Sequence, residues 1–175
     1  RIAEMIGTPG PATKRVLTFV PGTFTSADKF HRGGAQALPA WLVDQDDEMV
    51  AFVWKGAEFP GDDEGLGVTE QLAGIGEAND PARAAPAGGA LAHFVREMRT
   101  DIDVARASQI AGGYSWGLVP VTGSEVAGIH YDPVHSFAGA WMPRDWIPDA
   151  KTTYFHWSYT DFLSMAQDAG LVGDG

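Results

Sequence analysis

The chain contains several short apolar runs, each bounded by Gly, Pro or charged residues. Residues 16–20 (VLTFV) and 49–54 (MVAFVW) are the clearest, because they are rich in β-branched and aromatic residues. Uninterrupted runs of this length are typical of strands buried on both faces of a sheet. Three further runs predict additional strands, at 108–111, 134–138 and 152–157.

Helical periodicity occupies the segments between these runs. Apolar side chains recur every three or four positions from Leu91 to Ile102, which predicts an amphipathic helix. Thr25 or Ser26 can cap another helix that extends to about Leu42, although Gly33-Gly34 weaken it. Further helices are expected to begin near Ser115 and to cover 161–169.

Two segments carry no such pattern. Residues 1–14 are interpreted as an irregular lead-in, and residues 56–88 are rich in Gly, Pro, Ala and acidic residues. Loops as long as 56–88 usually form lids, binding loops or mobile segments. The alternation of strands and helices predicts a single α/β domain over 1–175, with a mostly parallel sheet and helices on both of its faces.

Composition narrows the classes of partner. The 23 acidic and 12 basic side chains give a net charge of −11, which disfavours binding to nucleic acids and anionic lipids. The chain has no cysteine, which removes disulfides and thiolate catalysis. It also lacks the roughly 18 to 20 consecutive apolar residues of a membrane helix, which indicates a soluble protein. We expect the segment from Arg1 to Gly175 to be part of a longer polypeptide, truncated at its C-terminus, so its compartment stays open.

The segment Gly113–Gly117 (GYSWG) matches the G-x-S-x-G pattern of a nucleophile elbow. In that motif a tight strand-to-helix turn strains the serine backbone, and the flanking glycines allow strand and helix to approach closely. The hydroxyl is then exposed at the carboxyl end of the sheet. Because a strand is predicted before Ser115 and a helix after it, we interpret Ser115 as a nucleophile. A Gly-rich turn with an incidental serine is the alternative.

A second turn, Pro21-Gly22-Thr23, directly follows the first buried strand. In an elbow-type hydrolase the corresponding turn supplies one backbone N–H of the oxyanion hole, and the residue after the nucleophile supplies the other. This assigns Thr23 and Trp116 as oxyanion donors through their main chains. A plain Pro-Gly turn that leads into a helix is an equally good interpretation of the local pattern.

An acid is expected after the serine in chain order. Asp161 follows the last predicted strand and starts a helix, so it is the candidate, with helix capping as its alternative role and Asp145 or Asp149 as substitutes. No histidine follows Asp161 in this sequence. His156 is the nearest candidate base, a core histidine is its alternative role, and we prefer a base that lies beyond Gly175.

Together these residues resemble the α/β-hydrolase domains that are widespread in actinobacteria and their phages. The resemblance covers most of the chain and rests on Val20–Thr23, on Val53–Pro60 and on Gly113–Gly117. It implies a Ser-Asp-His hydrolase with Ser115, Asp161, Thr23 and Trp116 in the roles given above. The chain departs from the family at Tyr114, where such domains often have histidine, and in having no counterpart of the catalytic histidine.

The sequence therefore predicts a serine hydrolase that acts on carboxylic esters or related small acyl compounds, without a cofactor. A non-catalytic, hydrolase-like binding or assembly module is the alternative. His130, Asp132 and His135 fit no zinc spacing, so no metal site is assigned. Several aromatic residues are candidates for an acyl pocket, with the core as their alternative place: Trp54, Phe59, Trp116, Trp141 and Trp146.

Overall fold

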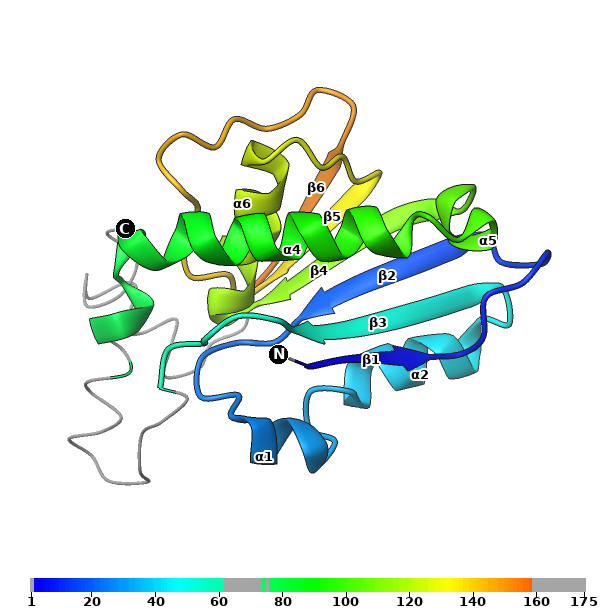
Figure 1. Ribbon diagram of the computed structural model, residues 1–175, viewed down its shortest axis with the longest axis horizontal. Helices are drawn as coiled ribbons and strands as arrows, with labels where there is room; N and C mark the ends of the chain where they lie inside the picture. The colour runs from blue at the N-terminus through cyan, green and yellow to red at the C-terminus, as the bar shows by residue number, and fades with distance from the viewer. Residues whose placement is uncertain (1, 62–73, 75, 159–175) are drawn as a thin grey trace.

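The computed structural model describes residues 2–61, 74 and 76–158, and its centre is a six-stranded sheet (Figure 1). The strands lie in the order β1-β3-β2-β4-β5-β6, and every neighbouring pair is parallel except β1 and β3. Their bounds are β1 (Ile2–Ile6), β2 (Arg15–Val20), β3 (Met49–Lys55), β4 (Ser108–Tyr114), β5 (Pro133–Phe137) and β6 (Thr153–Trp157). The predicted α/β class with a mostly parallel sheet is confirmed.

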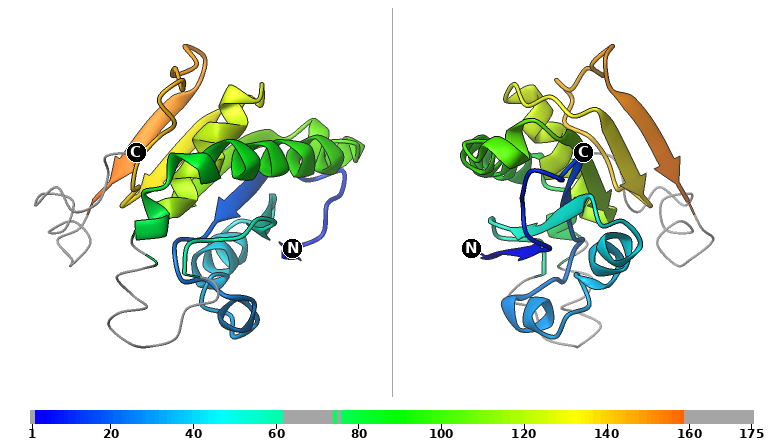
Figure 2. Two further views of the ribbon diagram at one scale, coloured as in Figure 1. Left: turned by 60° about the vertical axis from the view of Figure 1, so that its left-hand side comes forward. Right: turned by 90° about the vertical axis from the view of Figure 1, so that its right-hand side faces the viewer.

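Helices cover both faces of this sheet, as the two views of Figure 2 show. On one face lie α4 (Ala84–Met98) and α6 (Leu118–Val126), and on the other lie α1 (Ala27–His31) and α2 (Ala37–Gln45). The described residues also include the single-turn elements η1 (Pro81–Arg83), α5 (Ile102–Ala105) and η2 (Ser115–Gly117). None of the helices among the described residues has the length and apolar character that crossing a membrane requires.

The alternation of side chains along β2 divides the core into two layers. Val16 and Val20 pack in the cluster that includes the inner face of α4, whereas Leu17 and Phe19 pack with α2. Because successive side chains of a strand point to opposite faces, a fully apolar strand must be covered on both sides. The run that predicted this strand therefore also accounts for the layering.

Three boundary predictions were wrong. The lead-in contains β1, a short edge strand that pairs antiparallel with β3 and whose three middle side chains are exposed. The helix expected from Thr25 to Leu42 is two helices, α1 and α2, because the chain turns at Gly33 with a φ of 84°. The loop expected through Gly88 ends earlier, since α4 begins at Ala84.

Helices α4 and α6 meet at a pair of glycines. A Cβ atom added to Gly88 would lie 2.5 Å from the backbone carbonyl carbon of Gly123. Only residues without a side chain allow two helix backbones to come this close. The contact holds α6, and with it the turn at the start of α6, against the longest helix of the described structure.

Candidate active site

The turn that follows β4 has the geometry predicted for a nucleophile elbow. Tyr114 ends β4, Ser115 begins η2, and α6 continues from Leu118. Ser115 has a φ of 52°, in the left-handed region that residues other than glycine seldom occupy. Such strain is characteristic of functional sites when the surrounding structure enforces it.

Close backbone contacts enforce this conformation. A Cβ atom at Gly117 would lie 2.1 Å from the carbonyl oxygen of Val20, and one at Gly113 would lie 2.7 Å from the backbone nitrogen of Leu118. A Cβ atom at Gly22 would lie 2.9 Å from Cβ of Ser115. Glycine is therefore required at each of these three positions if β2, β4 and α6 are to meet around the serine.

An exposed serine was expected from the sequence, and that expectation was wrong: Ser115 is buried, with 7% of its surface exposed, because the turn after β2 and the segment after β5 pack against it. Its carbonyl oxygen accepts a hydrogen bond from the N–H of Ala140 at 3.1 Å. The segment that follows β5 is therefore attached directly to the elbow.

The turn after β2 lies against the elbow. Phe24 has a φ of 62°, and its N–H donates to the carbonyl of Pro60 at 2.8 Å. The Thr25 hydroxyl donates to the carbonyl of Gly22, which closes the turn. Thr23, between these residues, is half-buried. The turn is thus fixed in place beside Ser115.

The two predicted oxyanion donors, Thr23 and Trp116, would act through their main-chain N–H groups. Among the turn and loop hydrogen bonds of the described residues, none is donated by the N–H of Thr23 or of Trp116. The indole of Trp116 is buried in the core, where its ring lies 5.1 Å from the ring of Phe59. Trp116 therefore contributes packing through its side chain, and the role of its main-chain N–H as an oxyanion donor stays a prediction.

His156, the predicted base, is hydrogen-bonded to Ser136 and not to Ser115. Nδ1 of His156 lies 3.0 Å from Oγ of Ser136, which occupies the facing position on β5. Ser136 is in turn paired with Gly113 in the sheet, two residues before Ser115. The sequence did not indicate Ser136, because its place depends on the register of β5. Asp161 lies outside the described residues.

Asp149 and Asp145, the substitute candidates for the acid, make contacts away from Ser115. Asp149 accepts a hydrogen bond from Nδ1 of His130 at 2.9 Å and another from the N–H of Lys151. The Lys151 N–H, followed by His130, lowers the pKa of Asp149. Asp145 lines a shallow cavity with Pro143 and Arg144. Among the described residues, no group of three potential ligands is placed to hold a metal ion.

A half-buried carboxylate that the sequence did not reveal lies beneath the loop between β5 and β6. Glu125 accepts hydrogen bonds from Nε1 of Trp146 and from the hydroxyl of Tyr154, both at 2.8 Å. Burial raises the pKa of Glu125, and these two hydrogen bonds oppose the rise. The carboxylate therefore ties the loop to both α6 and β6.

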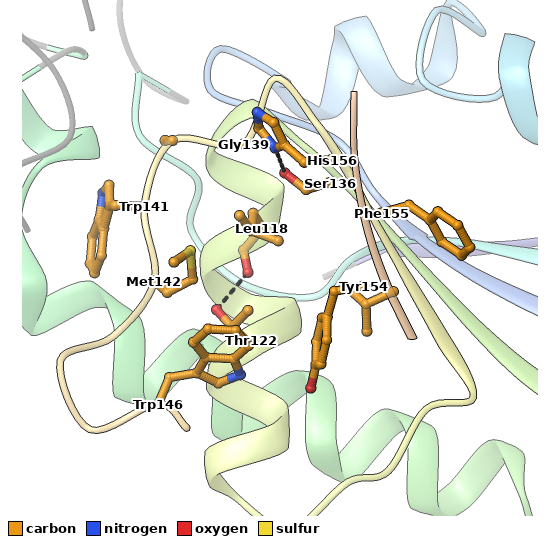
Figure 3. Close-up of a pocket in the computed structure, with 12 residues that line it drawn as sticks. Leu118, Thr122, Ser136, Gly139, Trp141, Met142, Trp146, Tyr154, Phe155 and His156 are labelled. Carbon is orange, nitrogen blue, oxygen red and sulfur yellow. Dashed lines mark hydrogen bonds between the residues drawn. The ribbon is translucent and has the colours of Figure 1, made fainter. Parts of the chain in front are cut away.

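Two cavities flank the elbow. One, of about 590 Å³, lies between α6, β5, β6 and the loop that joins the two strands (Figure 3). Trp141 and Trp146 line it, and Trp141 also belongs to the core, together with Trp54, Phe59 and Trp116. The other, of about 520 Å³, is bounded by residues on either side of the elbow: Phe19, Gly22, Lys29, Leu38, Tyr114 and Phe137.

Comparison with known proteins adds no relative, because neither the known family models nor the curated proteins give a match to this chain. The function is therefore inferred from the geometry of the site.

Proposed function

We propose that the protein is a serine hydrolase that acts on carboxylic esters, with Ser115 as its nucleophile. The observation that carries this proposal is the left-handed backbone of Ser115 in a turn closed by three required glycines. A non-glycine residue is held in this conformation at a cost of about 1–3 kcal/mol. An incidental serine would have no reason to be retained there, since glycine adopts the same backbone without strain.

The sheet supports the finer assignment to the α/β-hydrolase fold. Ser115 follows β4, an inner strand with parallel neighbours on both sides, and α6 begins directly after the turn. A serine between a central parallel strand and a helix is the structural context in which the G-x-S-x-G pattern is diagnostic. The resemblance noted from the sequence agrees with this arrangement.

In the proposed reaction, Oγ of Ser115 attacks the ester carbonyl and the alcohol leaves with a proton. The main-chain N–H groups of Thr23 and Trp116 would stabilise the negative charge that develops on the carbonyl oxygen. Water then hydrolyses the acyl-enzyme and restores the serine. His156 and Asp161 remain predictions as base and acid, because the contact observed for His156 is with Ser136.

Labelling with a fluorophosphonate probe tests the proposal. The full-length protein should be labelled at Ser115, and Ser115→Ala should abolish the labelling. Ser108→Ala is the matched control, because Ser108 lies at the opposite end of the same strand and its hydroxyl donates to Asp132. A folded, full-length protein that is not labelled at Ser115 would contradict the proposal and favour a non-catalytic binding module.

A further inference from the structure

The cavity shown in Figure 3 has a mostly apolar lining, with the Ser136–His156 pair at one end. Trp146 and Tyr154 also line it, but their polar atoms are already hydrogen-bonded to Glu125. Leu118 and Thr122 project into the cavity from α6, and Trp141, Met142 and Trp146 border it from the loop between β5 and β6. Thr122 uses its hydroxyl to donate to the carbonyl of Leu118, so it presents mainly its methyl group. An aliphatic chain fits such a surface, because burying apolar area is favourable and requires no polar partner.

The polar end is the pair formed by Ser136 and His156. Ser136 is 8% exposed, and Gly139 lies so close that a Cβ atom there would be 2.4 Å from Oγ of Ser136. The hydrogen bond between Oγ and Nδ1 occupies one donor and one acceptor, whichever tautomer the imidazole adopts. The pair still has a donor and an acceptor to offer to a ligand, which is the complement of a hydroxyl group.

The charge of the surroundings selects against anions. The described residues that line the cavity include no Lys, Arg, Asp or Glu. Behind the lining, the Glu125 carboxylate is held by Trp146 and Tyr154, and the chain as a whole has a net charge of −11. A carboxylate ligand would lose its hydration without gaining a cation.

The cavity is joined to the elbow through its own wall. Gly139 and Ala140 line it, and the N–H of Ala140 donates to the carbonyl of Ser115. We propose that this cavity binds an uncharged aliphatic alcohol, as the alcohol portion of the ester substrate, with the hydroxyl oxygen at Ser136 and His156. The ester context of this inference rests on the proposed function, whereas binding of the alcohol is measurable without turnover.

Binding of 1-octanol to the full-length Ser115→Ala protein tests this inference. Titration should change the tryptophan fluorescence saturably, since Trp141 and Trp146 border the cavity. Octanoate, which has the same chain length but a negative charge, should bind at least tenfold more weakly at neutral pH. Met142→Phe, at a residue that is 42% exposed, should reduce binding by narrowing the cavity without a change in the core.

Variants of the polar pair supply the specificity control. Ser136→Ala and His156→Gln should each weaken octanol binding about three- to tenfold, the range expected for loss of one hydrogen bond. Ser108→Ala and His93→Gln, both far from the cavity lining, should leave it unchanged. Circular dichroism spectra of all variants should match that of the parent.

The outcomes separate the two proposals. An unsaturable signal, equal affinity for octanoate, or unchanged affinity in both pair variants would overturn the inference. Labelling of Ser115 without octanol binding would overturn the inference alone. Octanol binding without labelling would overturn the hydrolase function and leave an alcohol-binding site.

Discussion

The elbow after β4 and the edge formed by β5 and β6 are neighbouring parts of one sheet that are built in opposite ways. At the elbow, backbone contacts backbone, and Gly113 and Gly117 leave no space for any side chain. At the edge, side chains make the contacts, as in the Ser136–His156 pair and the hydrogen bonds to Glu125. Steric exclusion therefore fixes a single geometry at the elbow. The β5–β6 edge tolerates adjustment, because its side chains can change rotamer.

Gly117→Ala tests this contrast most severely. Its Cβ atom would lie 2.1 Å from the carbonyl oxygen of Val20, which cannot move without displacing β2. We expect a loss of about 3 kcal/mol or more in the free energy of unfolding, measured by urea denaturation. Gly34→Ala, where a Cβ atom meets nothing within 4 Å, should change it by less than about 0.5 kcal/mol. Equal effects of the two substitutions would contradict the steric account.

Gly88 and Gly89, adjacent in α4, test whether close backbone contact decides the effect of an added side chain. Gly88→Ala would place a Cβ atom 2.5 Å from the backbone of Gly123, and a loss of about 1–3 kcal/mol in unfolding free energy is expected. Gly89→Ala meets nothing within 4 Å and should instead stabilise the helix by about 0.5–1 kcal/mol. Thermal denaturation of both variants should therefore give shifts of opposite sign. Shifts of the same sign would show that helix propensity, and not contact with α6, decides the outcome.

At the β5–β6 edge, the expected effect is a change in the pH dependence of stability. Burial raises the pKa of Glu125 above its ordinary 4.5, so the folded protein retains a proton that the unfolded chain releases. The contribution of Glu125 to stability is therefore complete below pH 4.5 and is lost as the pH rises through the higher, folded-state value. Glu125→Gln removes this loss, so the difference in unfolding free energy, variant minus parent, should increase with pH in that window. A difference that is independent of pH would contradict a raised pKa.

The smallest effect is expected at His130 and Asp149, because both side chains are substantially exposed to solvent. The N–H of Lys151, together with His130, lowers the pKa of Asp149, so its stabilising contribution is lost as the pH falls through the folded-state value. His130→Asn should reduce that acid-induced loss only slightly, since the backbone hydrogen bond remains. Urea denaturation of the parent and of His130→Asn between pH 3 and 6 measures this difference in the acid-induced loss of stability. A larger effect than that of Glu125→Gln would reverse the order predicted here.

The same contrast explains what the sequence could predict. Residues 16–20 and 49–54 were predicted as strands because their apolar character is continuous. The turn at Ser115 was predicted because a close backbone contact appears in the sequence as glycine at fixed spacing. The strand over Ile2–Ile6 was missed because Glu4 interrupts its apolar residues and its pairing with β3 is a property of the tertiary fold. The Ser136–His156 pair could not be foreseen, because it depends on the register of two strands separated by a 15-residue connection. Burial of Glu125 is likewise a tertiary property, since its sequence neighbours do not distinguish it from a surface carboxylate.

The glycine contact between α4 and α6 has a mechanical consequence. Since Gly88 and Gly123 interlock without intervening side chains, α6 has little freedom to slide or rotate against its neighbour. Any push on the exposed surface of α4 is therefore transmitted through a stiff coupling to the first turn of α6, and so to Ser115. The position of Ser115, the proposed nucleophile, therefore depends on α4, a helix that lies outside the turn.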